Sequence, residues 1–433
     1  MHISKVKVRE AMHKAGINTQ IQLAEKLGIT KNQLSVILSE KYNPYKSRFD
    51  DLCKILHVDP KMMIVSPLNS SKDLMLPDKN TPSISAIELF AGAGGLALGL
   101  EQAGITTLAH IEFDKYCCET LRNNRPHWNI ICDDIRNVDF SQYNGNIDLV
   151  TGGFPCQAFS YAGKKLGFDD TRGTLFHEFA RCIKETDPLM FMAENVRGLI
   201  SHDKGRTLST ILNVFEELNY QVEYKVLNAY DYGVPQKRER IVIIGTKNNM
   251  HFTFPSIAKT KKTLRDALKD VPLSEGQTYS STKKAVLDLV PPGGCWRNLP
   301  LEIQKSYMGK SFTSTGGRTG MARRISWDEP CLTVTCSPSQ KQTERCHPDE
   351  TRPFTVREYA RIQTFPDDWL FAGGIGTKYK QIGNAVPVYL AKQLGEQLVL
   401  AIKNYKDLAY HLKNQKNSLF IINDINSRKL KSL

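Results

Sequence analysis

An apolar segment that runs into a cluster of glycines constrains this chain more than any other feature. Residues 84–90 are typical of a buried strand, Gly92, Gly94 and Gly95 follow within five residues, and leucines at 96, 98 and 100 continue as a helix. A strand, a glycine turn and a helix in this order begin an α/β unit in which backbone can approach a ligand closely. The glycine loop alone does not identify the ligand, and it is equally compatible with binding of a nicotinamide dinucleotide.

Strands and helices alternate beyond this loop. The sequence predicts strands at 107–111, 129–132, 147–150, 189–192 and 240–245, with a helix over 116–122. Strands that alternate with helices indicate an α/β fold with a mostly parallel, doubly wound sheet. Ligands bind such sheets beyond the carboxyl ends of the strands, so reactive residues at those ends are the candidate site.

Residues 1–68 predict a separate helical unit. Thr19 can cap a helix in a capping box with Gln22, Gly28 makes a tight turn, and a further helix starts at residue 31. This pattern resembles the phage-repressor-like helix-turn-helix family. Its second helix would read a DNA major groove through the polar residues near its start, which are Lys31, Asn32, Gln33 and Ser35. A helical bundle used only for protein contacts is the alternative.

Changes in composition divide the rest of the chain. Residues 69–83 are rich in Pro, Ser, Asn, Lys and Asp and indicate a linker. Residues 84–248 form the α/β domain, which residues 352–405 complete. The alternation fails over 249–351, which predicts a smaller, irregular domain with a basic face. Residues 406–433 are interpreted as a basic tail.

Charge and cysteine usage restrict the class of partner and compartment. The formal net charge of +13 favours a polyanionic partner, nucleic acid first. The ten cysteines show no C-x-x-C spacing, which argues against a zinc site or a disulfide scaffold and for a reducing environment. No segment has the pattern of a signal peptide or a membrane span. We therefore predict a cytoplasmic protein without a metal site.

Reactive residues lie at or beside the ends of three of the predicted strands. Cys156 sits behind a proline, Glu194 follows a strand, and Arg238 and Arg240 lead into another. A cysteine and a carboxylate at neighbouring strand ends can face one substrate, and the two guanidiniums would lie on one side of an extended segment. Taken singly, each has an ordinary explanation, as a buried thiol, a helix-cap carboxylate or a solvated basic run.

Two acidic residues end neighbouring strands and suit a nucleoside. Glu112 ends the second strand, where a ribose hydroxyl would be held, and Asp134 ends the third, where it suits an adenine amino group. The glycine loop lacks the full G-x-G-x-x-G spacing of a dinucleotide site. S-adenosylmethionine is therefore favoured over a nicotinamide cofactor.

Taken in order, the motifs resemble those of the cytosine-C5 DNA methyltransferase family over residues 84–400. They are E-L-F-A-G-A-G-G at 88–95, G-F-P-C-Q at 153–157, E-N-V at 194–196, Q-K-R-E-R at 236–240 and Q-I-G-N-A-V-P at 381–387. Residues 323–335 look like the scaffold motif of the family's target-recognition domain, which would be 249–351.

The resemblance implies methyl transfer from S-adenosylmethionine to C5 of a flipped cytosine in duplex DNA. Cys156 would attack C6, Glu194 would bind N3, Arg240 would hold O2 and Arg238 would orient Glu194. Residues 159–176 would close on the base. The implied DNA contacts are Gln157 and Ser160. The implied cofactor residues are Phe90, Ala91, Gly92, Gly94, Gly95, Leu96, Glu112, Phe113, Asp134, Ile135, Pro155, Asn384 and Ala385, the last standing where many members have serine.

Further partners and alternatives follow from the same resemblance. A cognate restriction endonuclease acting on the same short site is one possible partner, and operator DNA bound by the N-terminal unit is another. Catalysis needs a monomer, whereas a helix-turn-helix on a palindrome suggests a dimer. The alternatives are a tRNA substrate, a catalytically silent DNA-binding regulator and a nicotinamide-dependent oxidoreductase.

Overall fold

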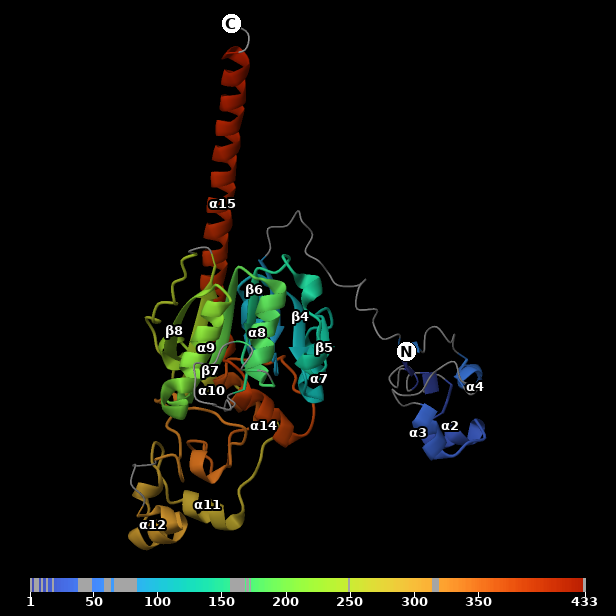
Figure 1. The fold of residues 1–433 in the computed structure, drawn as a ribbon. Coiled ribbons are helices and arrows are strands. Elements are labelled where there is room, and N and C mark those ends of the chain that lie inside the picture. The colour runs from blue at the N-terminus through green and yellow to red at the C-terminus, as the bar shows by residue number, and fades with distance from the viewer. Residues whose placement is uncertain are drawn as a thin grey trace. The chain divides into compact units, whose positions relative to one another are not determined.

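The computed structural model describes residues 2–3, 8, 11–12, 15–17, 19–37, 49–57, 64–65, 84–155, 168, 171, 173–247, 250–313 and 319–430. Cys156, Gln157 and Ser160 lie outside these ranges, as do the predicted linker and most of the predicted closing loop. The chain forms two compact units, Met1–Met75 and Leu76–Leu433, and each is described by itself (Figure 1).

The N-terminal unit is helical, as predicted. It holds α2 (Gln20–Lys26), α3 (Lys31–Ile37) and α4 (Phe49–Ile55), with the short antiparallel strands β1 (His2–Ile3) and β2 (Ile64–Val65). The predicted capping box is confirmed, because the Thr19 hydroxyl accepts the Gln22 N–H and the Gln22 side chain accepts the Thr19 N–H. A buried apolar cluster that includes Leu23, Leu34 and Leu52 joins the helices.

The second unit is built on a seven-stranded sheet. In spatial order the strands are β5 (Ile130–Cys132), β4 (Ile105–Glu112), β3 (Ile84–Leu89), β6 (Leu149–Gly152), β7 (Met190–Val196), β10 (Glu239–Thr246) and β8 (Gln221–Asn228). Parallel pairing of β3 with β4 and β6, and of β6 with β7, confirms the predicted doubly wound sheet. Near one edge β10 inserts between β7 and β8 and runs antiparallel to both.

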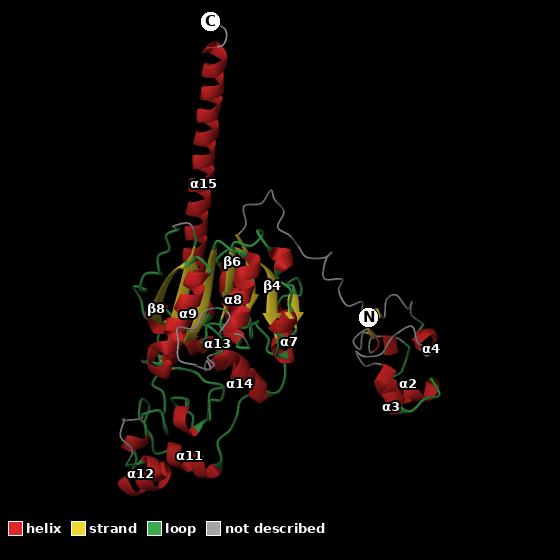
Figure 2. Ribbon diagram, viewed as in Figure 1, coloured by secondary structure: helices red, strands yellow, loops and turns green. Residues whose placement is uncertain are grey.

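Helices cover both faces of the sheet (Figures 1 and 2). Side chains alternate along each strand, so Met190 and Met192 of β7 join the apolar cluster formed with α6 (Gly95–Gln102) and α15 (Val388–Leu430). Phe191 points to the opposite face, where its ring lies 4.2 Å from that of Phe215 in α9 (Arg206–Glu217). On that face α8 (Leu175–Thr186) packs beside α9. Helix α7 (Lys115–Asn124) connects β4 to β5 and contacts both strands.

The segment after β10 is irregular, as predicted, and has a small core of its own. This core holds Leu287, Val290 and Leu299, and the segment returns to the sheet domain where β11 pairs in parallel with β9. The remaining elements are β9 (Gln236–Lys237), α10 (Leu264–Leu268), α11 (Ser281–Leu287), α12 (Leu301–Met308), β11 (Cys331–Leu332), α13 (Val356–Ile362) and α14 (Ile375–Asn384).

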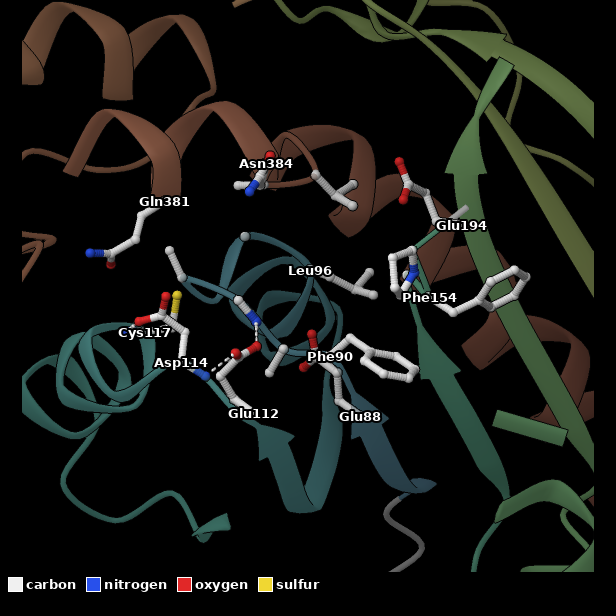
Figure 3. Close-up of a pocket in the computed structure, with 18 of the residues that line it drawn as sticks. Glu88, Phe90, Leu96, Glu112, Asp114, Cys117, Phe154, Glu194, Gln381 and Asn384 are labelled. Carbon is white, nitrogen blue, oxygen red and sulfur yellow. Dashed lines mark hydrogen bonds between the residues drawn. The ribbon is translucent and has the colours of Figure 1, made fainter. Parts of the chain in front are cut away.

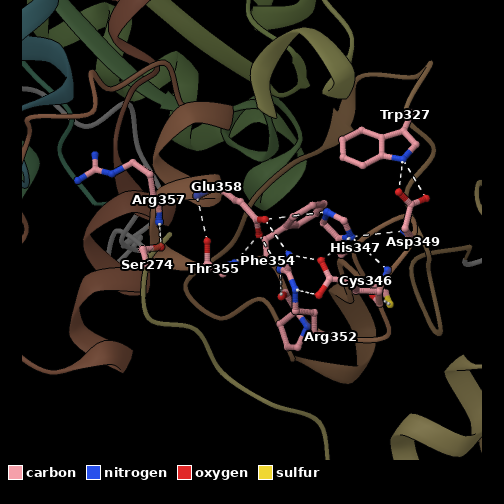
Figure 4. A network of polar contacts seen from close by, with 12 residues as sticks. Ser274, Trp327, Cys346, His347, Asp349, Arg352, Phe354, Thr355, Arg357 and Glu358 are labelled. Atoms are coloured by element: carbon pink, nitrogen blue, oxygen red, sulfur yellow. Dashed lines mark hydrogen bonds and ion pairs between the residues drawn. The ribbon is translucent and has the colours of Figure 1, made fainter. Parts of the chain in front are cut away.

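A polar network fixes the chain where it re-enters the sheet domain (Figure 4). The Arg352 guanidinium donates to Glu358 at 2.8 Å and to Glu350 at 3.1 Å. The His347 ring packs edge-on against Trp327, with centroids 5.2 Å apart. Burial, followed by the nearby Arg352 charge, lowers the pKa of His347. Its Nδ1 accepts the N–H groups of Asp349 and Glu350.

The C-terminal helix does not end at the predicted start of the tail. Leu390, Leu394, Leu398 and Ile402 of α15 are buried against α6 and the sheet, and the helix continues without a break to Leu430. None of the described helices is long and apolar enough to cross a membrane.

Candidate active site

The carboxyl ends of the central strands surround a cavity of about 400 Å³ (Figure 3). The glycine loop forms one wall, α14 contributes Thr377, Lys380, Gln381 and Asn384 to another, and the ends of β6, β7 and β10 form a third. Nine of the implied cofactor residues line it, namely Phe90, Ala91, Gly92, Gly95, Leu96, Glu112, Pro155, Asn384 and Ala385.

Glu112 is held in this cavity by backbone donors. Its two carboxylate oxygens accept the N–H groups of Gly92 and Asp114, each at 2.7 Å. Burial raises the pKa of Glu112, although these hydrogen bonds oppose the shift. A carboxylate has about four acceptor positions, so both oxygens can still accept a hydroxyl from a ligand.

The glycine loop packs closely against a distant segment. A Cβ at Gly95 would lie 2.2 Å from the carbonyl oxygen of Val386. Any larger residue would therefore displace the glycine loop from the Q-I-G-N-A-V-P motif at 381–387. Gly94 does not line the cavity, because it faces Leu121 and Trp369 instead. Phe90 has a φ of 58°, a strained conformation for a non-glycine residue that places it at the cavity wall.

A smaller cavity of about 230 Å³ adjoins the first and shares Phe90 and Glu112 with it. It is lined by three of the four remaining implied cofactor residues, Phe113, Asp134 and Ile135. The Phe113 side chain is 75% exposed and lies over this hollow as an available apolar surface. The guanidinium of Arg136 donates to both oxygens of Asp134 and lowers the pKa of that carboxyl.

Glu194 and Arg240 form an ion pair in the lining of the larger cavity. They lie on the antiparallel strands β7 and β10, and 2.7 Å separates Glu194 Oε1 from Arg240 Nε. Gly153 faces the other carboxylate oxygen so closely that a Cβ there would lie 3.0 Å from Glu194 Oε2. The pair is therefore positioned beside the strand end from which the chain enters the Pro155–Cys156 segment.

The prediction that Arg238 orients Glu194 is wrong in this structure. The Arg238 guanidinium donates to the carbonyl oxygens of Val334, Gly383 and Ala385 at 2.9–3.1 Å. Arg238 is 1% exposed, and burial lowers the pKa of Arg238 to about 9. Arg238 therefore joins the segment after β11 to the end of α14, and Arg240 contacts Glu194 directly.

Asn195 has a positional role that the sequence reasoning missed. Its Nδ2 donates to the Phe154 carbonyl oxygen at 2.8 Å and is buried. This bond fixes the backbone two residues before Cys156. The E-N-V motif at 194–196 was the available signal for Asn195, but a role was predicted only for its glutamate. Asn384 likewise has a partner that was not foreseen, since its Oδ1 accepts from the Cys336 thiol.

The predicted DNA-reading residues of the N-terminal unit lie at the start of α3. Lys31 and Asn32 are exposed there. The Gln33 Oε1 accepts the Thr30 N–H at 2.8 Å, and the Thr30 hydroxyl accepts the Gln33 N–H at 3.2 Å, so Gln33 also caps its own helix. The side chain of Ser35 lies outside the described set.

A doubly wound sheet, a glycine loop and acidic strand ends around one cavity define a methyltransferase-type α/β domain. A prophage-encoded Escherichia coli protein described as a DNA modification methyltransferase has this fold, with a TM-score of 0.54, 24% identity and coverage of 74% of this chain and 100% of that one. The Entamoeba histolytica methyltransferase EhMeth aligns with a TM-score of 0.51 and 15% identity over 73% of this chain and 98% of that one.

Sequence comparison gives the family. Residues 84–400 match the model for C-5 cytosine-specific DNA methylases, and residues 7–61 match a Cro/C1-type helix-turn-helix DNA-binding domain. The type II methyltransferase M.Sau96I of Staphylococcus aureus is 51% identical, covering 92% of this chain and 98% of that protein. M.Eco47II of E. coli is 58% identical over 73% of this chain and 78% of its own length. The chain belongs to the C-5 cytosine-specific DNA methylase family, and the nicotinamide-dependent alternative is not favoured.

Proposed function

We propose that this protein transfers a methyl group from S-adenosylmethionine to C5 of cytosine in a short duplex DNA site and so protects the DNA from a cognate endonuclease. One observation carries the proposal: Glu194, paired with Arg240, opens on the same cavity as the glycine loop and Glu112. The residues that would bind the base and those that would bind the nucleoside of the cofactor therefore line the same cavity. The type II relatives support the modification role.

The residues present fit the proposed cofactor. The two adjoining cavities share Phe90 and Glu112, as an elongated ligand with a nucleoside and an amino acid part requires. Glu112 would accept the ribose hydroxyls, Asp134 would accept the adenine amino group, and Phe113 would cover the ring. When bound, S-adenosylmethionine supplies an electrophilic methyl group.

The chain's own residues would make cytosine reactive. The Cys156 thiolate would add to C6, while Glu194 gives a proton or hydrogen bond to N3 and Arg240 holds O2. Electron density then reaches C5, the atom that accepts the methyl group. Removal of the C5 proton and cleavage of the bond between C6 and Cys156 then complete the replacement of the C5 hydrogen by the methyl group. Asn195 would fix the start of the Cys156 segment through Phe154. The target base must leave the helix first.

Covalent trapping tests the proposal. Bisulfite sequencing of DNA from cells that express the protein would first define the site. A duplex carrying 5-fluorocytosine at that site, with cofactor present, should then form a denaturation-resistant adduct with the protein, and Cys156→Ala should abolish it. Methylation of tRNA but not of duplex DNA, or no adduct on the correct duplex, would contradict the proposal.

We also propose that the helix-turn-helix unit binds operator DNA as a dimer and represses transcription of the gene that encodes this protein. The protein would act in the cytoplasm. The exposed side chains of Lys31 and Asn32 at the start of α3 support major-groove binding. A methyltransferase with a recognition domain needs no second DNA reader for catalysis, so regulation is the simpler use.

A further inference from the structure

A buried pair of ionisable side chains that the proposed mechanism does not use lies at the cofactor cavity. Glu88 and His110 are directly opposed in the pairing of β3 and β4, and 3.1 Å separates Glu88 Oε2 from His110 Nδ1. Each residue is 0% exposed. Glu88 is also part of the cavity lining, near Phe90 (Figure 3).

The hydrogen bonding of this pair is incomplete. Glu88 Oε1 and His110 Nε2 have no hydrogen-bond partner among the described residues. A proton on Nδ1 gives Glu88 Oε2 its donor and leaves Nε2 as a bare acceptor, whereas a second proton on Nε2 would bury an unpaired N–H. The His110 ring stacks on Trp128 at 4.4 Å, which fixes its plane. With that proton on Nδ1, Glu88 Oε2 accepts from His110, and Oε1 is left without a hydrogen-bond partner among the described residues.

A buried carboxylate is costly unless a cation compensates it. Two basic side chains line the same cavity, but Arg240 is paired with Glu194 and Lys380 with Asp114. Among the described residues, the partner of Glu88 is His110, which supplies a positive charge only when both of its ring nitrogens are protonated. A ligand in the cavity is therefore the available source of positive charge.

We propose that Glu88, positioned by His110, is the counter-charge for the methylsulfonium of the cofactor, so that the cavity favours the methyl donor over its neutral thioether product. This inference rests on the proposed use of S-adenosylmethionine. In a water-poor cavity a charge acts over several ångströms without direct contact. Because methyl transfer removes the positive charge from sulfur, the attraction ends with the reaction and product release becomes easier.

Calorimetric binding to the full-length protein tests this idea. The ligands are S-adenosylmethionine, sinefungin, which carries a protonated amine near the same position, and S-adenosylhomocysteine, which is neutral there. Glu88→Gln should reduce the preference for the two charged ligands over S-adenosylhomocysteine by about tenfold, equivalent to about 1.4 kcal/mol. His110→Phe, which keeps an aromatic ring against Trp128 but removes the donor, should act in the same direction. His110→Asn, which keeps a donor near the Nδ1 position, should restore most of the preference.

Thr151→Val is the matched control. Thr151 is the residue opposed to Glu88 on the other side, in β6, and it is equally buried. It carries no charge, so its loss should leave the ligand preference unchanged. Equal losses for all three ligands in Glu88→Gln would overturn the assignment, since the ammonium that they share would then be the partner. An unchanged preference in both Glu88→Gln and His110→Phe would also overturn it. A wild-type protein that binds none of the three would instead contradict the proposed cofactor, and this inference with it.

Discussion

Arg240 Nε lies 2.7 Å from Glu194 Oε1, across two antiparallel strands that come from segments more than forty residues apart. This contact holds the carboxylate in one orientation in the cavity lining, where it would meet the flipped cytosine. The ion pair therefore provides the first test of the proposed chemistry.

Glu194→Gln should lower the rate of methyl transfer by about 10²–10⁴-fold, the usual range for loss of an acid–base group. The amide keeps the shape of the side chain but cannot deliver a proton to N3. Cofactor affinity, measured by calorimetry, should stay within about twofold of the wild-type value, because Glu194 is paired with Arg240 and Glu112 is held by separate backbone donors. A variant with wild-type transfer rates would exclude Glu194 from the chemistry.

Arg238→Met should mainly reduce stability. The substitution removes three hydrogen bonds to carbonyl oxygens, and we expect a loss of about 3 kcal/mol in the free energy of unfolding, since buried carbonyls lose charged donors. Thermal unfolding would measure it. The fraction that remains folded should still form the 5-fluorocytosine adduct, in contrast to Arg240→Met. Loss of the adduct at full stability would instead give Arg238 a catalytic role.

Gly153→Ala should slow methyl transfer by roughly ten- to a hundredfold, because the new methyl group would displace the Glu194 carboxylate by a few tenths of an ångström. Gly198→Ala is the control, since a Cβ there would meet its nearest neighbour at 3.9 Å. Single-turnover rates of the two variants should differ clearly. Similar rates would mean that the position of Glu194 is not limiting.

Cofactor affinity should fall as the solution becomes acidic. Only the ionised Glu112 carboxylate offers all its acceptor positions to the ribose hydroxyls, and burial raises the pKa of Glu112 above its ordinary value of 4.5. The carboxylate fraction, and with it the affinity, therefore declines at a higher pH than for an exposed glutamate. Calorimetry from pH 8 down to pH 5 would detect this. Glu112→Gln should bind more weakly and show no such decline.

The helix-turn-helix unit should be separable from methylation. Deletion of residues 1–68 should preserve methylation and derepress the gene, measured with a promoter fusion. In the full-length protein, Asn32→Ala should weaken operator binding by about 1–3 kcal/mol without changing the methylation rate. Asn32 is a cleaner probe than Gln33, which also caps α3. Loss of methylation in a folded deletion variant would mean that the unit takes part in catalysis.

Much of this protein could be predicted because local chemistry specifies it. Apolar segments and glycines predicted where the central strands lie along the chain, since buried parallel strands are nearly continuously apolar. The order of these strands in the sheet came from the structure. The Thr19–Gln22 capping box involves residues three positions apart, so the sequence alone indicated it. Strand β8 was not predicted, because at the sheet edge seven of its eight residues are exposed or half-buried and they form no apolar segment.

Only the tertiary structure decided which arginine contacts Glu194. The sequence placed Arg238 and Arg240 on one side of an extended segment, but Arg238 lies in a break between β9 and β10, where simple alternation does not hold. Its partners come from residues 334, 383 and 385. Such contacts depend on the insertion of β10 between β7 and β8 and on the return of α14 to the sheet. The motifs therefore determined the chemistry available to the chain, whereas long-range packing determined which side chains perform it and which hold the fold together.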